Sequence, residues 1–363
     1  PQGGAVNAVA ATTATARRPL FTVVIPVLND ARWLPGAVAS VLAQTEARWE
    51  LIVGDNASDD NLTGVLECFV DSRLVLRRWR RRVGLHENFN RCCSLGSGRW
   101  VLPLGADDRL HADCLAVLGQ QIESIASYES RLAMVVAACQ RVTVDGKPAE
   151  AGYFGTQPML ALRSGVYTPE EWLRCATRPG EPVWNIGSLA VSRLVLEHSG
   201  GLFRPDVGLC ADNELVLRAG AYGHVLYIDR PLLDYTVRPD SDVSARFERG
   251  LAERDGQTAH GRALLTGLAA HERRRRVSGR DRQAVHAAVA RAYLLRAGAH
   301  RLRPGGQGRV GAAADVLRAW RRSPGTLLTA DAVLRSLAAV AAPLKVLNWR
   351  RDLAARHTRE EQA

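Results

Sequence analysis

Carboxylate side chains follow apolar segments in the first half of the chain. Asp55 opens a polar run that extends to Asp60, and Asp107 and Asp108 follow an apolar segment that ends at Leu104. Carboxylate oxygens are hard ligands that suit Mg²⁺ or Mn²⁺, and they also accept hydrogen bonds from N–H groups of a ligand. Each cluster alone is equally compatible with a turn or a helix cap.

The segments before these clusters are predicted to be strands. Short apolar runs at 21–27 (FTVVIPV), 49–54 (WELIVG) and 100–104 (WVLPL) are separated by helix-like segments, the first from Asn29 or Asp30 to about Gln44. Such alternation predicts a mostly parallel sheet with helices on both faces. Ligands of these sheets bind outside the carboxyl ends of the strands. We therefore expect residues 26–30, 55–60 and 107–108 to meet at one edge.

The second half of the sequence has fewer predicted strands and ends in predicted helices. Further strands are expected at 74–76, 132–139 and 224–228, with a helix near 86–95. After about residue 244 the segments are rich in Arg and Ala and read as helices. The prediction is an α/β domain over 19–245 and an α-helical C-terminal region over 246–363. The Ala- and Thr-rich residues 1–18 are expected to be a disordered leader, because they lack apolar side chains that could offset the entropy of ordering.

Composition narrows the class of protein. The chain has 363 residues, 47% of them hydrophobic and 23% charged, which is typical of a soluble globular protein. The sequence contains no run of about 18 uncharged apolar residues, so it predicts no membrane-spanning helix. The seven cysteines are odd in number and scattered, which favours reduced thiols and a cytoplasmic location.

The net charge of +11 favours an anionic partner: nucleic acid, an acidic membrane surface or a phosphorylated substrate. No nucleic-acid-binding motif is present, and no G-x-G-x-x-G follows a strand, so we expect neither nucleic acid nor NAD as a ligand. The basic run Arg77–Arg82 is read as a solvated loop, with phosphate attraction as the alternative. The basic amphipathic stretch 330–351 either packs on the protein or lies on an anionic membrane surface, peripherally on the inner face of the plasma membrane.

The ordered motifs over about 21–244 resemble family 2 glycosyltransferases of the GT-A fold. The matching stretches are VVIPVLND (23–30), SVLAQT (40–45), WELIVGDNASDD (49–60), residues 84–90, LGADDRL (104–110) and ADNELVLR (211–218). The resemblance implies that the protein transfers a sugar, with inversion, from a nucleoside-diphosphate sugar. The nucleotide of this donor is expected to be UDP or dTDP. The resemblance further implies a glycan, lipid-linked or small-molecule acceptor, in the assembly of polysaccharide, glycolipid or glycosylated natural products.

The resemblance also assigns the donor side of the site. It places the donor against Pro26, Val27, Asn29, Asp55, Asn56, Asn90, Asp107 and Arg238. Asp107 and Asp108 match an acidic motif that holds Mg²⁺ or Mn²⁺ at the diphosphate. Gly105 replaces the first aspartate of that motif, Asp-x-Asp-Asp. Arg238 stands where relatives carry a metal-binding histidine, and it is expected to pair with the diphosphate instead.

On the acceptor side the resemblance assigns Asp212 as the general base that takes the proton of the acceptor hydroxyl. Trp184 either stacks on a sugar ring or belongs to the core, and Asn185 is expected to bond the acceptor. A sugar-nucleotide pyrophosphorylase is disfavoured, because no Gly-rich basic loop follows the first strand. Departures from the family pattern at Gly105, Ala211 and Arg238 keep open a scaffold that binds nucleotide sugar or glycan without transfer.

Overall fold

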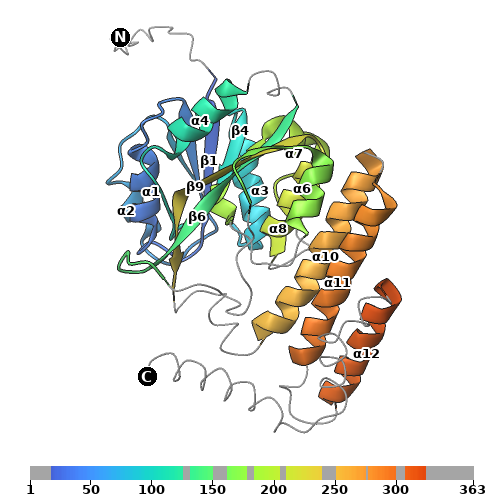
Figure 1. Cartoon of the computed structure of the whole chain (residues 1–363). Coiled ribbons are helices and arrows are strands. Elements are labelled where there is room, and N and C mark those ends of the chain that lie inside the picture. The colour runs from blue at the N-terminus through green and yellow to red at the C-terminus, as the bar shows by residue number, and fades with distance from the viewer. Residues whose placement is uncertain are drawn as a thin grey trace, which may run out of the picture.

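The computed structural model describes residues 18–125, 131–149, 162–177, 184–204, 210–238, 251–274, 277–299 and 307–323. Its strands are β1 Phe21–Val27, β2 Trp49–Asp55, β3 Leu74–Arg78, β4 Trp100–Pro103, β5 Arg109–Leu110, β6 Leu132–Thr143, β7 Gly165–Tyr167, β8 Leu189–Ser192 and β9 His224–Val237. They form one sheet in the order β3-β2-β1-β4-β8-β6-β9-β5, with β7 on β9 (Figure 1).

The first half of this sheet is parallel, as predicted. β1 pairs in parallel with β2 and β4, and β2 with β3. Val27 and Asp55, the last residues of β1 and β2, are partners in the register. β8 pairs antiparallel with both β4 and β6, while β6 and β9 are parallel. The short antiparallel strands β5, β7 and β8 were not anticipated from the sequence.

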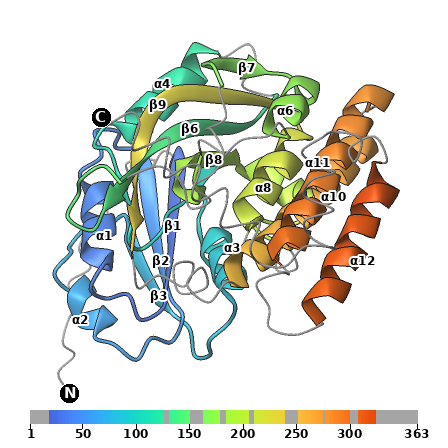
Figure 2. The ribbon, with the colours of Figure 1, turned by 60° about the horizontal axis from the view of Figure 1, so that its bottom comes forward.

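Helices cover both faces of the sheet (Figure 2). They are α1 Leu34–Leu42, α2 Leu62–Leu66, α3 Leu85–Leu95, α4 Cys114–Ser124, α6 Pro169–Ala176, α7 Arg193–Ser199 and α8 Ala211–Gly220, with the 3₁₀ turn η1 Ile186–Ser188. Phe21, Val23 and Ile25 pack into the core with α1 and α4, whereas Val24 packs into the core with α3 and α8. Burial on both faces explains the uninterrupted apolar sequence of β1.

The first helix begins later than the sequence predicted. Asn29 has φ 57, in the left-handed region that an α-helix does not contain. The carbonyl of Asp30 accepts hydrogen bonds from Trp33 N and Leu34 N in a turn, and the helix starts at Leu34. Asn29 and Asp30 therefore belong to the loop after β1 and do not cap α1.

The C-terminal region is helical, as predicted. It comprises α10 Leu251–Arg274, α11 Gly279–Ala299 and α12 Gln307–Arg322, and α10 packs directly on α8 (Figure 1). Leu217 of α8 joins Leu264, Leu268 and Val289 in one apolar cluster. The carbonyl of Leu217 also accepts a hydrogen bond from His271 Nε2, at 3.1 Å. The two regions thus share a buried interface.

Several predictions fall outside the described residues. These are the leader over residues 1–17, the boundary at 245 and the basic stretch 330–351. Within the part of the chain that the structure describes, no helix is both long and apolar enough to cross a membrane. The seven cysteines are all described, and all are thiols.

Candidate active site

A polar loop joins the ends of β1 and β2. Asp55 Oδ1 accepts a hydrogen bond from Ser58 N, at 2.8 Å, and Ser58 Oγ accepts one from Asn29 N, at 3.0 Å. Asn56 N donates to the carbonyl of Val27, at 2.9 Å. These bonds bring Val27, Asn29, Asp55 and Asn56 together at the carboxyl edge of the sheet, next to Pro26 in β1, as the sequence predicted.

Asp55 lies beneath an arginine from the basic run. Its carboxylate is buried, and Oδ2 is 3.1 Å from Arg78 Nη1 without the alignment of a hydrogen bond. Arg78 also donates to the carbonyl of Ser58, at 2.8 Å, and Arg82 pairs with Asp59. The arginines of the run 77–82 are exposed, in line with the reading of a solvated run, and two of them also bond the loop after β2. An incoming N–H group can reach Asp55 Oδ2 only when Arg78 moves aside.

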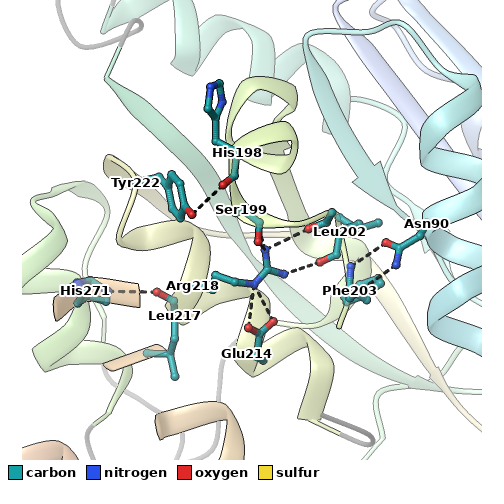
Figure 3. A network of polar contacts seen from close by, with 11 residues as sticks. Asn90, His198, Ser199, Leu202, Phe203, Glu214, Leu217, Arg218, Tyr222 and His271 are labelled. Carbon is teal, nitrogen blue, oxygen red and sulfur yellow. Dashed lines mark hydrogen bonds and ion pairs between the residues drawn. The ribbon is translucent and has the colours of Figure 1, made fainter. Parts of the chain in front are cut away.

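Two asparagines assigned to the donor use their amides elsewhere. The side chain of Asn56 bonds both the N–H and the carbonyl of Val83, at 2.9 and 2.8 Å. The side chain of Asn90 bonds the N–H and the carbonyl of Phe203, at 2.9 and 2.8 Å (Figure 3). These bonds use one N–H group and one oxygen lone pair of each amide and fix its orientation. In this structure both residues position loops.

The second acidic cluster follows β4 and is held by β9. Asp108 is buried, and its Oδ1 accepts a hydrogen bond from Thr236 N, at 3.0 Å. Burial, reinforced by the neighbouring charge of Asp107, raises the pKa of Asp108 well above its ordinary value. A Cβ atom on Gly105 would lie 2.7 Å from Asp108 Oδ2 and 2.9 Å from Asp107 Oδ1. The two carboxylates thus converge on space that a side chain at position 105 would fill.

Arg238 links the loops after β1 and β4. Its guanidinium lies 2.9 Å from Asp30 Oδ1 and 2.8 Å from Asp107 Oδ2, and its side chain is only 11% exposed. The guanidinium carbon also lies 5.2 Å from the ring centroid of Trp33. A permanent positive charge therefore stands beside the acidic pair.

The acidic pair can form part of a metal site. Within the described ranges, no group of three or more His, Cys, Asp and Glu side chains is arranged to hold a metal ion. Mg²⁺, however, is commonly bound through one or two carboxylates, with phosphate oxygens and water completing its coordination. The converging oxygens of Asp107 and Asp108 fit that incomplete donor set.

Asp212 lies in the first turn of α8, a helix that packs against β6. The residue is half-buried, its Oδ1 accepts a hydrogen bond from Asn213 N at 2.8 Å, and burial raises the pKa of its carboxyl. Burial, followed by smaller contributions that include the charges of Asp108 and Asp212, raises the pKa of the Cys139 thiol on β6 to about 12. The elements that hold the two carboxylates adjoin one another, because Thr236 of β9 bonds Asp108, β9 pairs with β6, and α8 packs against β6.

A buried ion pair fixes the helix that carries Asp212. Arg218 Nε lies 2.8 and 3.0 Å from the two carboxylate oxygens of Glu214, and both side chains are almost fully enclosed. Its other nitrogens donate to the carbonyls of Ser199, Gly201 and Leu202, at 2.9 to 3.1 Å. Figure 3 shows this network beside the Asn90–Phe203 pair. Together they hold α8, the segment after α7 and α3 in one arrangement.

Comparison with known proteins identifies the family of one part of the chain. Residues 22–144 match the family model described as "Glycosyl transferase family 2". This segment is a family 2 glycosyl transferase domain. The matched range of the family 2 domain includes Asp30, Asp55, Asp107 and Asp108, whereas Asp212 and Arg238 lie beyond it.

Curated relatives match about a quarter of the chain. A PGL/p-HBAD biosynthesis glycosyltransferase of Mycobacterium bovis is 37% identical over 102 residues, which are 27% of this chain and 40% of the relative. The UDP-Glc:alpha-D-GlcNAc-diphosphoundecaprenol beta-1,3-glucosyltransferase WfgD of Escherichia coli is 34% identical over 89 residues, 24% of this chain and 35% of the relative. The chain therefore matches less than half the length of these relatives.

Solved structures show that the fold extends beyond the family 2 domain. S. aureus TarS 1-349, solved in complex with UDP-GlcNAc, is 13% identical with a TM-score of 0.52, over 83% of this chain and 89% of that one. The mannosyltransferase PcManGT of Pyrobaculum calidifontis, solved with GDP-Man and Mn²⁺, is 19% identical with a TM-score of 0.50, over 89% and 86%. The fold is that of the GT-A glycosyltransferases.

The two residues assigned to the acceptor, which lie outside the family 2 domain, pack against or bond neighbouring residues of the protein. Trp184 is 5% exposed, packs on Trp172 at a centroid distance of 5.7 Å and donates to Asn213 Oδ1 at 3.1 Å. Its indole thus belongs to the core and presents no face on which a sugar could stack. Asn185 Oδ1 accepts a hydrogen bond from Gly187 N, at 3.0 Å, and so caps η1.

Proposed function

We propose that the chain transfers a sugar, with inversion, from a nucleoside-diphosphate sugar to an acceptor hydroxyl. The observation that carries this proposal is that the elements holding Asp108 and Asp212 are neighbours: β9, which bonds Asp108, pairs with β6, and α8, which carries Asp212, packs against β6. One carboxylate follows β4 within the family 2 domain, and the other opens α8 outside it. This brings an acidic group suited to the diphosphate close to a carboxylate suited to a hydroxyl proton.

The donor would bind along the edge formed by the loops after β1, β2 and β4. Asp55 Oδ2, which lacks an aligned hydrogen bond, would accept a ring N–H of uracil or thymine once Arg78 has moved. Arg238 would exchange part of its pairing with Asp30 and Asp107 for the diphosphate. Asp107 and Asp108 would hold Mg²⁺ or Mn²⁺, which supplies positive charge to the leaving diphosphate.

Asp212 would take the proton of the acceptor hydroxyl as it attacks the anomeric carbon. Its raised pKa makes the carboxylate a stronger base than an exposed aspartate, which suits this role. Acceptors with free hydroxyls fit: glycans, lipid-linked sugars and small molecules. The direct test is release of nucleoside diphosphate from a panel of UDP-, dTDP- and GDP-sugars, with and without Mn²⁺. A scaffold without activity would bind a donor but release no product in the presence of any acceptor.

Replacing Asp55 with alanine is expected to weaken UDP binding by about 10- to 100-fold. A hydrogen bond to a charged group contributes about 1.5–3 kcal/mol, and the variant cannot accept the ring N–H. Isothermal titration with UDP measures the effect. Asp59→Ala in the same loop is the matched control. The Asp59 side chain is exposed and pairs with Arg82, whereas the bond from Asp59 to Asn29 comes from the backbone N–H, which the variant keeps. Equal affinities of Asp55→Ala and wild type would refute the assignment of Asp55.

The pH profile of transfer should report Asp212. Only the ionised carboxylate can accept a proton, so kcat/KM falls as the pH drops through the pKa of Asp212. Because burial raises this pKa, the acid limb should lie above the ordinary aspartate value of about 3.9. Initial rates at saturating metal between pH 4 and 9 measure the limb. A profile that stays flat down to pH 4 would exclude Asp212 as the base.

A further inference from the structure

A second pocket lies at the opposite edge of the sheet from the acidic clusters. Its volume is about 510 Å³, and its lining includes Arg18, Arg99, Arg131, Arg193 and Arg274. Arg18, Arg99 and Arg131 precede β1, β4 and β6, whereas Asp55 and Asp107 lie at or after carboxyl ends of strands. Strand β1 has 7 residues. At about 3.3 Å per residue, this places the two edges roughly 20 Å apart. A ligand in this pocket would be separate from the donor.

Arginines outnumber acidic residues in this pocket. Its lining contains five arginines and one acidic residue, Glu197. A second carboxylate, that of Glu50, lies behind the wall, since it accepts hydrogen bonds from Thr22 Oγ1 and Gly98 N. Arg18, Arg131, Arg193 and Arg274 form no ion pair with any residue in the described ranges. Elsewhere in the fold, arginines such as Arg218 and Arg238 are paired with carboxylates. Arginines in excess of the neighbouring carboxylates repel one another, and a bound anion would relieve this repulsion.

Neutral groups hold two of these arginines in place. Arg193 donates to the carbonyls of Gly98 and Cys93, at 2.6 and 3.2 Å, and to Thr22 Oγ1, at 3.0 Å. These acceptors are neutral, although Thr22 Oγ1 in turn donates to the Glu50 carboxylate, at 2.7 Å. Arg18 Nε donates to the carbonyl of Ser97, at 2.5 Å. The guanidinium groups are thereby positioned before any ligand arrives, which lowers the entropy cost of binding.

The far wall of the pocket comes from α7 and the residues after α8. The hydroxyl of Tyr222 donates to the carbonyl of His198, at 3.0 Å (Figure 3). The guanidinium carbon of Arg274 lies 4.2 Å from the centroid of the Tyr222 ring. Arg274, at the end of α10, is thus held over a fixed aromatic surface and contributes its charge from the C-terminal region.

We propose that this pocket binds a phosphate-bearing anion, either a phosphomonoester or a diphosphate group. The planar guanidinium matches phosphate oxygens in paired hydrogen bonds, and several arginines are a typical set for such a group. The volume suits a small ligand or a lipid headgroup. Both sources offer the same chemistry. Leu194 lines the pocket and is 67% exposed, so it would contact acyl chains if the phosphate belonged to a membrane lipid.

The test uses pyrophosphate as the probe and the full chain with paired charge reversals. Arg131→Glu/Arg274→Glu changes two exposed pocket residues, and Arg321→Glu/Arg322→Glu makes the same charge change at the exposed end of α12. Isothermal titration should show that the pocket variant loses a pyrophosphate-binding event, or binds at least tenfold more weakly, while the α12 variant matches wild type. Any contribution of the donor site is common to both. If the glutamates prevent folding, Arg131→Gln/Arg274→Gln replaces them.

Flotation with vesicles of phosphatidylglycerol and phosphatidylcholine identifies the source. Loss of binding to phosphatidylglycerol in the pocket variant but not in the α12 variant assigns a lipid phosphate. Equal flotation of the two variants, together with the difference in pyrophosphate binding, assigns a soluble phosphate compound. The proposal is overturned if the two variants behave alike in both assays.

Discussion

Replacing Asp212 with asparagine should lower kcat by about 10³-fold and leave the affinity for UDP unchanged. Asparagine has the same shape and still accepts the hydrogen bond from Asn213 N, but it cannot take a proton. General-base catalysis typically contributes about 10²- to 10⁴-fold to a rate. Steady-state kinetics with a saturating acceptor gives kcat, and titration with UDP gives the donor affinity. A fall in kcat alone separates catalysis from binding.

The matched control for this variant is Asp229→Asn, on the exposed part of β9. It makes the same chemical change away from the site and should retain the wild-type rate. The acid limb of the pH profile should also disappear in Asp212→Asn, because the group that produces it is gone. Equal product release by wild type and Asp212→Asn would instead favour the scaffold that binds without transfer.

Replacing Arg218 with methionine should lower the free energy of unfolding by about 3–5 kcal/mol. Methionine fills much of the volume of the arginine but leaves the Glu214 carboxylate buried without its partner. Breaking a buried ion pair from one side costs this much, because an uncompensated charge remains in the interior. Three backbone carbonyls after α7 lose their donor as well. Urea denaturation followed by circular dichroism measures the change.

The fold provides its own control for burial. Glu87 and Arg91 on α3 form an ion pair with the same four-residue spacing, but both side chains are substantially exposed. Arg91→Met should therefore cost no more than about 1 kcal/mol. The double variant Glu214→Leu/Arg218→Met should recover part of the lost stability, since no charge is then left unpaired. If Arg91→Met and Arg218→Met lowered the free energy of unfolding by similar amounts, burial of the Glu214–Arg218 pair would be shown to be unimportant.

The early strands and their acidic ends were predictable because each signal is local. The β-branched run of β1 and the carboxylates after β2 and β4 are contiguous in the sequence, and a parallel sheet brings its carboxyl ends to one edge. The error at the start of α1 was also local. It arose because Asn29 tolerates the left-handed conformation that ends the strand, a choice that the residue type permits but does not require.

The remaining site features depend on contacts between distant segments. Asn90 bonds the backbone of Phe203, 113 positions away, and no local pattern indicates that its amide is occupied. Strand β9 was foreseen only to residue 228, but its extension carries Thr236 to Asp108. The sequence also gave no sign that α8 and β9 would both lie against β6. The basic pocket likewise collects arginines from five separate segments.

The packing of α10 on α8 also bears on how this chain could be divided or recombined. Leu217 and His271 join the two regions through an apolar cluster and a hydrogen bond, and α8 carries Asp212 at its first turn. A shortened chain ending before Leu251 would expose to solvent the face of α8 that packs on α10, and α8 carries the proposed base Asp212. Exchanging C-terminal regions between relatives, as a route to new acceptors, therefore requires that the outward-facing residues of α8 travel with the transplanted helices.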